Sequence, residues 1–221
     1  IGAYAIDKQT GKLKLLNKQP TGGDNSSSVM PDPSNRYIVL ANGPGVAVFP
    51  VKEDGSLAPR SDLALPSGEP GPYRHHQDKS HPHQAWFDLT GRFVVVPDKG
   101  LDKVHVYRFD ASGGKLVPCE PPFVKCRHGA GPRHVIFHPA GPYAYVVNEL
   151  DSTVTAYHWN SERGELRPFQ IITTLPTTYT GDSTGAEIAI APSGKFVYAS
   201  NRGHDSIVIY SVDPASGMLA H

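Results

Sequence analysis

One pattern recurs four times along the chain and constrains the fold more than any other feature. Each copy is a turn containing Gly or Asn, then an aromatic residue, then a β-branched run that ends in Asn or Asp. The four copies are DPSNRYIVLAN (32–42), DLTGRFVVVPD (88–98), HPAGPYAYVVN (138–148) and APSGKFVYASN (191–201). Successive copies lie about 50 residues apart, which is a period typical of repeat architectures.

A second pattern follows each copy and has the form of a strand, a polar turn and a Leu that begins another strand. The segments are VAVFPVKEDGSL, VHVYRFDASGGKL, VTAYHWNSERGEL and IVIYSVDPASGML, and the opening IGAYAIDKQTGKL is a fifth. Their apolar residues alternate with a period of two, and no segment shows the helical period of 3.6. A repeat of about 50 residues built from about four short strands indicates a β-propeller, whose blades are small antiparallel sheets.

We therefore expect an all-β chain, a β-propeller of four-stranded antiparallel blades that forms a single domain over residues 1–221. The copies amount to about four to four and a half blades. The first copy lacks its first two strands, and the last copy stops at GMLAH. Because an open ring would expose strand edges and apolar faces, we expect a fragment of a longer propeller, incomplete at both ends.

Composition narrows the partners and the cellular compartment. The chain carries 21 Lys+Arg and 21 Asp+Glu, and this balance argues against nucleic acid or an acidic membrane surface as partner. No apolar run approaches the ~20 residues that span a bilayer. Cys119 and Cys126 favour free thiols in a reducing compartment, although a local bridge stays open. We expect a cytoplasmic protein, with an export signal ahead of residue 1 still open, and the sequence predicts no oligomeric state.

Differences between the repeats locate a candidate site. The first two strands of a blade form a hairpin, so the start of one lies beside the end of the other. Three hairpins carry charged or titratable pairs there: His83 with Lys99, Arg133 with Glu149, and Glu187 with Arg202. Because first strands line the central channel of a propeller, these groups should converge on one mouth, where convergent polar groups indicate a site. The alternative is that they are salt bridges between blades.

Three long segments of the chain resemble the lactonase family of seven-bladed propellers. They are HPHQAWFDLTGRFVVVPDKGLDKVHVYRFD, GAGPRHVIFHPAGPYAYVVNELDSTVTAYHW and AEIAIAPSGKFVYASNRGHDSIVIYSVD. This family contains the propeller-type 6-phosphogluconolactonases and the fungal carboxy-cis,cis-muconate cyclases. The resemblance covers nearly the whole chain, and it implies functional residues in the HPH, GPRH, NEL and SNRG motifs. Those residues are His83 (or His81), Arg133, Glu149 and Arg202.

The resemblance implies hydrolysis of an anionic sugar lactone, namely 6-phosphogluconolactone to 6-phosphogluconate in the pentose phosphate pathway. Glu149 or His83 would activate the water, and the other would protonate the ring oxygen as it leaves. Arg133 and Arg202 suit an anionic substrate, because guanidinium binds phosphate or carboxylate through two parallel bonds. One of them could also stabilise the oxyanion. Further candidate substrate contacts are His81, Lys99, His134, Glu187 and His204.

Two other functions stay open. In a muconate cyclase the same arginines would hold carboxylates, and the acid/base pair would open or close a lactone without water. A non-catalytic propeller that serves as an interaction platform is also a common use of this fold, but it predicts a mouth without converging Arg, His and Glu side chains. His204 could instead be a structural loop residue paired with Asp205.

The histidine-rich stretch RHHQDKSHPHQ first suggests a metal site. His81 and His83 would share one face of a strand and could ligate zinc. Pro82 intervenes, however, no further ligands accompany the pair, and two arginines at the mouth would repel a cation. We expect neither a metal nor a cofactor. His75 and His76 are expected in a solvated loop outside the site, and the segment TTLPTTYTGDSTG (173–185) in a loop that borders the mouth.

Overall fold

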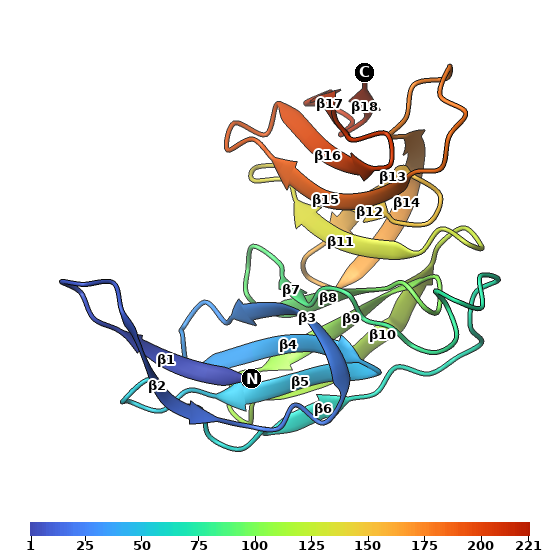
Figure 1. The fold of residues 1–221 in the computed structure, drawn as a ribbon. Helices are drawn as coiled ribbons and strands as arrows, with labels where there is room; N and C mark the ends of the chain where they lie inside the picture. Colours follow the sequence, from blue (N-terminus) through green and yellow to red (C-terminus); the bar gives the residue numbers. More distant parts are fainter.

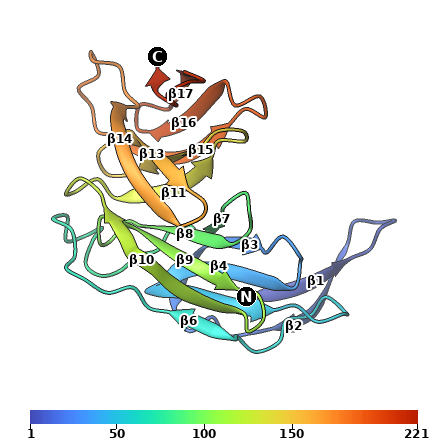
Figure 2. The same cartoon turned by 180° about the vertical axis from the view of Figure 1, so that it is seen from behind.

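The computed structural model describes residues 1–221, and its regular elements are all β-strands. Four antiparallel sheets of four strands, named here blades 1 to 4, follow one another in chain order (Figures 1 and 2). Blade 1 consists of β3 (Asp24–Pro31), β4 (Tyr37–Gly43), β5 (Gly45–Pro50) and β6 (Asp62–Ala64). Blade 2 consists of β7 (Trp86–Phe87), β8 (Phe93–Asp98), β9 (Lys103–Asp110) and β10 (Lys115–Lys125).

The other two blades and an N-terminal hairpin complete the chain. Blade 3 consists of β11 (Pro132–Phe137), β12 (Tyr143–Asn148), β13 (Thr153–Asn160) and β14 (Glu165–Thr173). Blade 4 consists of β15 (Thr184–Ile190), β16 (Phe196–Arg202), β17 (Ser206–Val212) and β18 (Leu219–Ala220). The hairpin pairs β1 (Gly2–Ile6) with β2 (Leu13–Lys18). The predicted all-β architecture of four-stranded blades is confirmed, whereas the single incomplete domain stays a prediction.

The period-two alternation of the strands buries both faces of an inner blade. Along β8, Phe93 and Val95 pack into a cluster with blade 3, whereas Val94 and Val96 pack into a cluster with blade 1. All four side chains are fully buried. Successive residues of a strand point to opposite faces, so a continuous apolar run is what a strand packed on both sides requires.

The recurrent turn between the first two strands of a blade is closed by a side chain. In blade 2 the Asp88 carboxylate accepts hydrogen bonds from the backbone N–H groups of Arg92 and Phe93, at 3.1 and 3.0 Å. In blade 1 the Asp32 carboxylate accepts the N–H of Tyr37 at 2.7 Å. Asp favours turns for this reason. These bonds fix where each second strand begins, and therefore where it ends at the mouth.

Apolar side chains remain exposed at the two ends of the row of blades. On blade 4, Ile207 and Ile209 of β17 are 67% and 55% exposed, and on the hairpin Ile6 and Leu13 are exposed to a similar extent. The first strands lie toward the interior of the arc, where β11 contacts β8 on one side and β15 on the other (Figure 1). Both cysteines are free thiols. The structure contains no helix that could serve as a membrane span.

Candidate functional site

The first strand of each inner blade has a break in register near its start, and this break aims the candidate side chains. The pairing of β11 with β12 shifts between Pro132 and His134, so Arg133 lies in a bulge. In blade 2, Pro82 forms an isolated bridge to Asp98, ahead of the regular ladder. A bulge bends its strand and redirects a side chain. Arg133 and His83 therefore turn sideways, toward neighbouring blades.

Glu149 lies at the centre of the mouth, directly after β12, and is buried. Its Oε2 atom accepts a hydrogen bond from Nε of Arg133 at 2.9 Å. Its Oε1 atom lies 3.2 Å from Nζ of Lys99 and 3.3 Å from Nη2 of Arg202. We call these four residues the Glu149 cluster. They come from blades 2, 3 and 4, so the cluster forms only where three blades meet.

The charge of the Glu149 cluster is positive overall. Burial raises the pKa of Glu149, but the charges of Lys99, Arg202 and Arg133 outweigh burial and hold the pKa below its usual value. Glu149 is therefore an ionised carboxylate. Three cations surround this single buried anion, so the mouth retains an excess of positive charge.

Beside the cluster, three side chains form a hydrogen-bonded line that we call the histidine chain. Nδ1 of His134 lies 2.8 Å from Oε1 of Glu187, and Nε2 of His134 lies 3.1 Å from Nδ1 of His83. Nη1 of Arg133 also points at Nε2 of His134, at 3.3 Å. Arginine can only donate, so Nε2 of His134 must accept, and its Nδ1–H donates to Glu187.

The tautomer of His83 follows from the same bonds. Because Nε2 of His134 accepts, Nδ1 of His83 carries the hydrogen that lies between the two rings. Nε2 of His83 therefore carries a lone pair, and it forms no hydrogen bond within the protein. Burial, followed by the charge of Arg133, lowers the pKa of His83 to about 3. His83 is thus a neutral imidazole with a free acceptor nitrogen at the mouth.

The remaining site carboxylate is ionised as well. Burial raises the pKa of Glu187, but the hydrogen bond from His134 and the backbone N–H of Ile188 outweigh it, so the pKa lies below its usual value. No three His, Cys, Asp or Glu side chains stand together in an arrangement that would hold a metal ion.

The structure brings the six predicted groups to one mouth but changes two of the three predicted pairs. Arg133 pairs with Glu149 as expected. Lys99, expected beside His83, pairs with Glu149 of the next blade, and Glu187, expected beside Arg202, bonds His134 of the preceding blade. Breaks in strand register explain this difference, because one between Pro82 and Trp86 turns His83 toward blade 3, and one between Gly185 and Ile188 turns Glu187 toward blade 3. The groups are therefore inter-blade contacts and a convergent polar site at the same time.

His81 lies next to His83, with the ring centroids 6.1 Å apart. Burial, followed by the charge of Lys99, lowers its pKa. A hollow of about 190 Å³ is lined by His81 and Lys99 together with His75 and His76. His75 and His76 are solvent-exposed as expected, but their loop folds back so that they line this hollow at the mouth.

His204 does not join the cluster. Its Nδ1 lies 2.6 Å from Oγ of Ser206, and its ring packs edge-on against Tyr179 at 4.6 Å. The expected partner Asp205 instead accepts the backbone N–H of Gly203. His204 thus stabilises its own loop. The expectation that segment 173–185 borders the mouth is confirmed, because its last residues line a hollow with Arg202.

Two buried residues behind the mouth, Asp102 and Gln77, support the site but could not be identified from the sequence. The Asp102 carboxylate accepts hydrogen bonds from Nε2 of Gln77 at 2.8 Å and from the backbone N–H groups of Gly129 and Gly131 at 2.6 and 2.8 Å. Nε2 of Gln77 also donates to the carbonyl oxygen of Lys99 at 2.8 Å. Together they hold the turn that leads to Arg133 and the backbone that carries Lys99.

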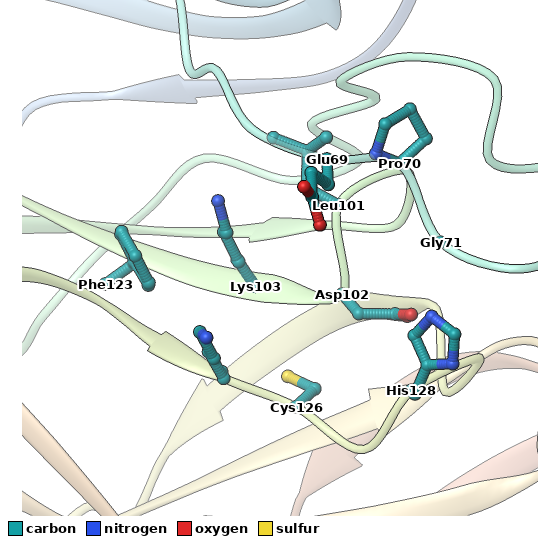
Figure 3. A pocket seen from close by; sticks show the side chains of 10 residues that line it. Glu69, Pro70, Gly71, Leu101, Asp102, Lys103, Phe123, Cys126 and His128 are labelled. Atoms are coloured by element: carbon teal, nitrogen blue, oxygen red, sulfur yellow. The ribbon is translucent and has the colours of Figure 1, made fainter.

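A further hollow of about 440 Å³ lies beside the turn that carries Asp102 (Figure 3). Lys103 and Phe123 lie at one end, with Nζ 4.4 Å from the ring centroid, and Asp102 and His128 lie at the other. Burial raises the pKa of Cys126 in its wall to about 12, so this thiol is not activated. None of the predicted site residues lines this hollow, so the Glu149 cluster is the candidate site.

Comparison with known proteins agrees with this geometry. The chain belongs to the family described as lactonase, 7-bladed beta-propeller, which matches residues 1–221. It is similar to the 6-phosphogluconolactonase of Bacillus subtilis, with 40% identity over 222 residues that cover 100% of this chain and 62% of the relative. It is also 33% identical over 225 residues to the 6-phosphogluconolactonase of Formosa agariphila, covering 99% of this chain and 62% of the relative.

A solved structure shows the same fold. The periplasmic gluconolactonase of Pseudomonas aeruginosa superposes with a TM-score of 0.88 at 32% identity, covering 99% of this chain and 61% of that chain. The chain thus spans about three fifths of the length of these relatives.

Proposed function

We propose that the protein hydrolyses a sugar lactone, 6-phosphogluconolactone, to 6-phosphogluconate in the pentose phosphate pathway. One observation carries the proposal: an ionised, buried Glu149 surrounded by three cations, next to a neutral His83 whose Nε2 is free. The names of the relatives support lactone hydrolysis, because two of them are 6-phosphogluconolactonases and a third is a gluconolactonase.

In this proposal the Glu149 cluster attracts and holds an anionic lactone. Glu149 neutralises one of its three cations, and the remaining positive charge attracts a phosphate or carboxylate. A guanidinium or ammonium group also stabilises the negative charge that develops on the carbonyl oxygen when water attacks. Glu149 cannot serve as the proton donor, because its carboxylate is ionised. Its role is to hold Lys99 and Arg133 in place.

His83 is assigned the proton transfers. Its Nε2 accepts a proton from a water molecule while the water oxygen bonds to the lactone carbonyl carbon. When the tetrahedral intermediate collapses, the bond to the ring oxygen breaks, and His83 gives the proton to that oxygen. The negative charge of the substrate lies close to the imidazole of His83 during these steps, which raises the pKa of His83 above its value in the free protein.

The test is a substrate profile of the protein in the full length that its gene encodes. We expect turnover of 6-phosphogluconolactone above the spontaneous rate, and a loss of roughly 10²–10⁴-fold in the His83→Gln variant. Arg163→Gln is the matched control, because Arg163 is exposed on the turn between β13 and β14. Activity on carboxy-cis,cis-muconate alone would replace the proposal with the cyclase reaction. If neither Arg133→Gln nor Glu149→Gln alters turnover of any lactone, the enzymatic function is wrong.

A cytoplasmic location is part of the proposal, since the pathway implies it. One structural relative is described as periplasmic. Fractionation of cells that express the full-length protein, probed with an antibody, distinguishes the two compartments. Recovery in the periplasmic fraction alone would contradict the pathway assignment and favour an unphosphorylated lactone as substrate.

A further inference from the structure

The two arginines of the Glu149 cluster are not equivalent. Arg133 donates from Nε to Glu149 and from Nη1 to the carbonyl oxygen of Ala186 at 2.6 Å, and its side chain is 16% exposed. The Arg202 side chain is 53% exposed. Only its Nη2 contacts the protein, 3.3 Å from Glu149 and 3.4 Å from the carbonyl oxygen of Gly185. Nε and Nη1 of Arg202 have no acceptor, so this guanidinium can take a ligand without losing a buried bond.

Arg202 also borders a hollow that is large enough for a ligand group. The hollow measures about 480 Å³, and Tyr73, His76 and Thr184 line it with Arg202. The hydroxyls of Tyr73 and Thr184 and the ring nitrogens of His76 form no hydrogen bond within the protein. Tyr73 and His76 come from the loop before β7, and Thr184 is the first residue of β15. The loop before β7 and the loop before β15 lie on the same side of the molecule (Figures 1 and 2). Asp182 is the one carboxylate among the lining residues.

The backbone around Arg202 is fixed, although its side chain is free. Oγ of Ser183 donates to the carbonyl oxygen of Arg202 at 3.2 Å. Gly203 has a φ of +112°, and a Cβ atom there would lie 2.3 Å from the carbonyl oxygen of Asp182. Only glycine fits this close approach in the left-handed region. The loop before β15 is therefore packed tightly against the Arg202 turn, which holds the hollow open at a defined place beside the cluster.

We propose that Arg202, Thr184, Tyr73 and His76 form a subsite for the phosphoryl group of a phosphorylated sugar lactone. The inference rests on the proposed lactonase function. It assigns different roles to the three cations of the Glu149 cluster. The exposed guanidinium takes the phosphoryl oxygens through two parallel bonds, and the hydroxyls supply further donors. Because Arg202 also reaches Glu149, a lactone held there extends its ring toward Glu149 and His83, and Arg133 and Lys99 remain for the carbonyl end.

The experiment compares two substrates in the full-length protein: 6-phosphogluconolactone and glucono-lactone without the phosphate. The ratio of their kcat/KM values is the measure, because effects on the shared lactone end cancel in it. We expect the Arg202→Gln variant to lower this ratio by roughly 10–100-fold, as expected for lost charge-assisted hydrogen bonds. Thr184→Val should lower it by roughly 2–10-fold. The control Arg163→Gln should leave the ratio and both individual values unchanged.

Inorganic phosphate provides a second readout that needs no turnover of the phosphorylated lactone. It should inhibit competitively in the parent protein, and its inhibition constant should rise by at least ~10-fold in Arg202→Gln. An unchanged ratio in Arg202→Gln overturns the subsite. A selective fall of the ratio in Arg133→Gln instead moves the phosphoryl group to Arg133. If the parent protein hydrolyses neither lactone, the proposed function fails, and this result is distinct from an active protein with an unaltered ratio.

Discussion

The Nζ atom of Lys99 lies 3.2 Å from Oε1 of Glu149, and both side chains are almost completely buried, at 10% and 8% exposure. Lys99 follows β8 in blade 2 and Glu149 follows β12 in blade 3, so this ion pair crosses a blade boundary. Burying an ion pair costs desolvation energy that its attraction often fails to recover. The pair is therefore expected to add little net stability, and its place at the centre of the mouth favours a functional role.

Replacing Glu149 by Gln should be strongly destabilising. The change removes the one anion and leaves Lys99 and Arg133 buried without a counter-charge, which typically costs about 3–5 kcal/mol. Urea unfolding followed by circular dichroism measures the loss. The matched control is Glu165→Gln, because Glu165 pairs with the exposed Arg167. That pair is screened by solvent and should contribute little to stability. Equal losses of unfolding free energy in the two variants would mean that Glu149 is not needed to balance the charge of the three cations.

The histidine chain predicts a difference between two substitutions of Glu187. In Glu187→Leu the Nδ1–H of His134 loses its acceptor, and the preferred tautomers of His134 and His83 are no longer fixed. We expect kcat to fall roughly 10–100-fold with little change in KM. Glu187→Gln keeps an amide oxygen that can accept the same hydrogen bond, so its kcat should lie close to that of the parent. If KM rises in both variants while kcat is kept, Glu187 contacts the substrate directly.

The lowered pKa of His83 predicts the acid limb of the activity profile. A histidine with its ordinary pKa of about 6.5 would be protonated, and lost as a base, as the pH falls below that value. With a pKa of about 3, His83 stays neutral throughout this range. Plots of kcat/KM against pH should therefore show no inflection of His83 between about pH 7 and pH 5. An inflection near pH 6.5 that disappears in His83→Gln would contradict the neutral, buried imidazole.

The lowered pKa of His83 also makes the stability of the fold depend on pH. Between its folded pKa of about 3 and its unfolded pKa of about 6.5, His83 binds a proton only in the unfolded chain. The free energy of unfolding therefore falls as the pH is lowered through this window, by at most ~1.4 kcal/mol per pH unit. Because other groups also titrate, the useful quantity is the difference between the parent and His83→Gln at pH 7 and pH 5. Relative to His83→Gln, the free energy of unfolding of the parent should be lower at pH 5 than at pH 7. An unchanged difference would refute this link between the pKa of His83 and stability.

The exposed apolar rows predict how residues 1–221 behave when produced alone. Ile207 and Ile209 form an apolar row on β17, and the hairpin exposes a second one through Ile6 and Leu13. Contiguous exposed apolar surface drives association. We expect this piece to self-associate in analytical ultracentrifugation at micromolar concentration, and the double substitution Ile207→Lys with Ile209→Lys to reduce it. Lys195→Gln on the same blade is a control that should not.

The repeats predict the sheets well, because the information is local. A β-branched run after a turn specifies a strand, and the alternation in segments such as 93–98 indicates which strands are buried on both faces. The convergence of His83, Arg133, Glu149 and Arg202 on one mouth follows from the same register. Each hairpin brings its own residues to the same end, and the propeller arrangement, which the repeat period indicates, gathers these ends at one mouth.

The partners of these residues could not be predicted, because they depend on contacts between blades. A bulge is a shift in the pairing of one strand with another, and nothing in the sequence around Arg133 indicates the bulge there. The bond from His134 to Glu187 and the bond from Gln77 to Asp102 join segments that are far apart in the chain. The loop that carries His76 folds back over the mouth for the same reason, through packing that the local sequence does not specify.

The shared strand β8 has a consequence for how the protein opens. Phe93 and Val95 pack into one core while Val94 and Val96 pack into the other, so blade 2 cannot unfold without uncovering both. The amides of β8 and β12 should then exchange their hydrogens with solvent together, as one cooperative unit. The ion pair of Lys99 with Glu149 breaks in that same event, because it crosses the boundary between blades 2 and 3. Catalytic competence and the slowest hydrogen exchange would therefore disappear at the same denaturant concentration.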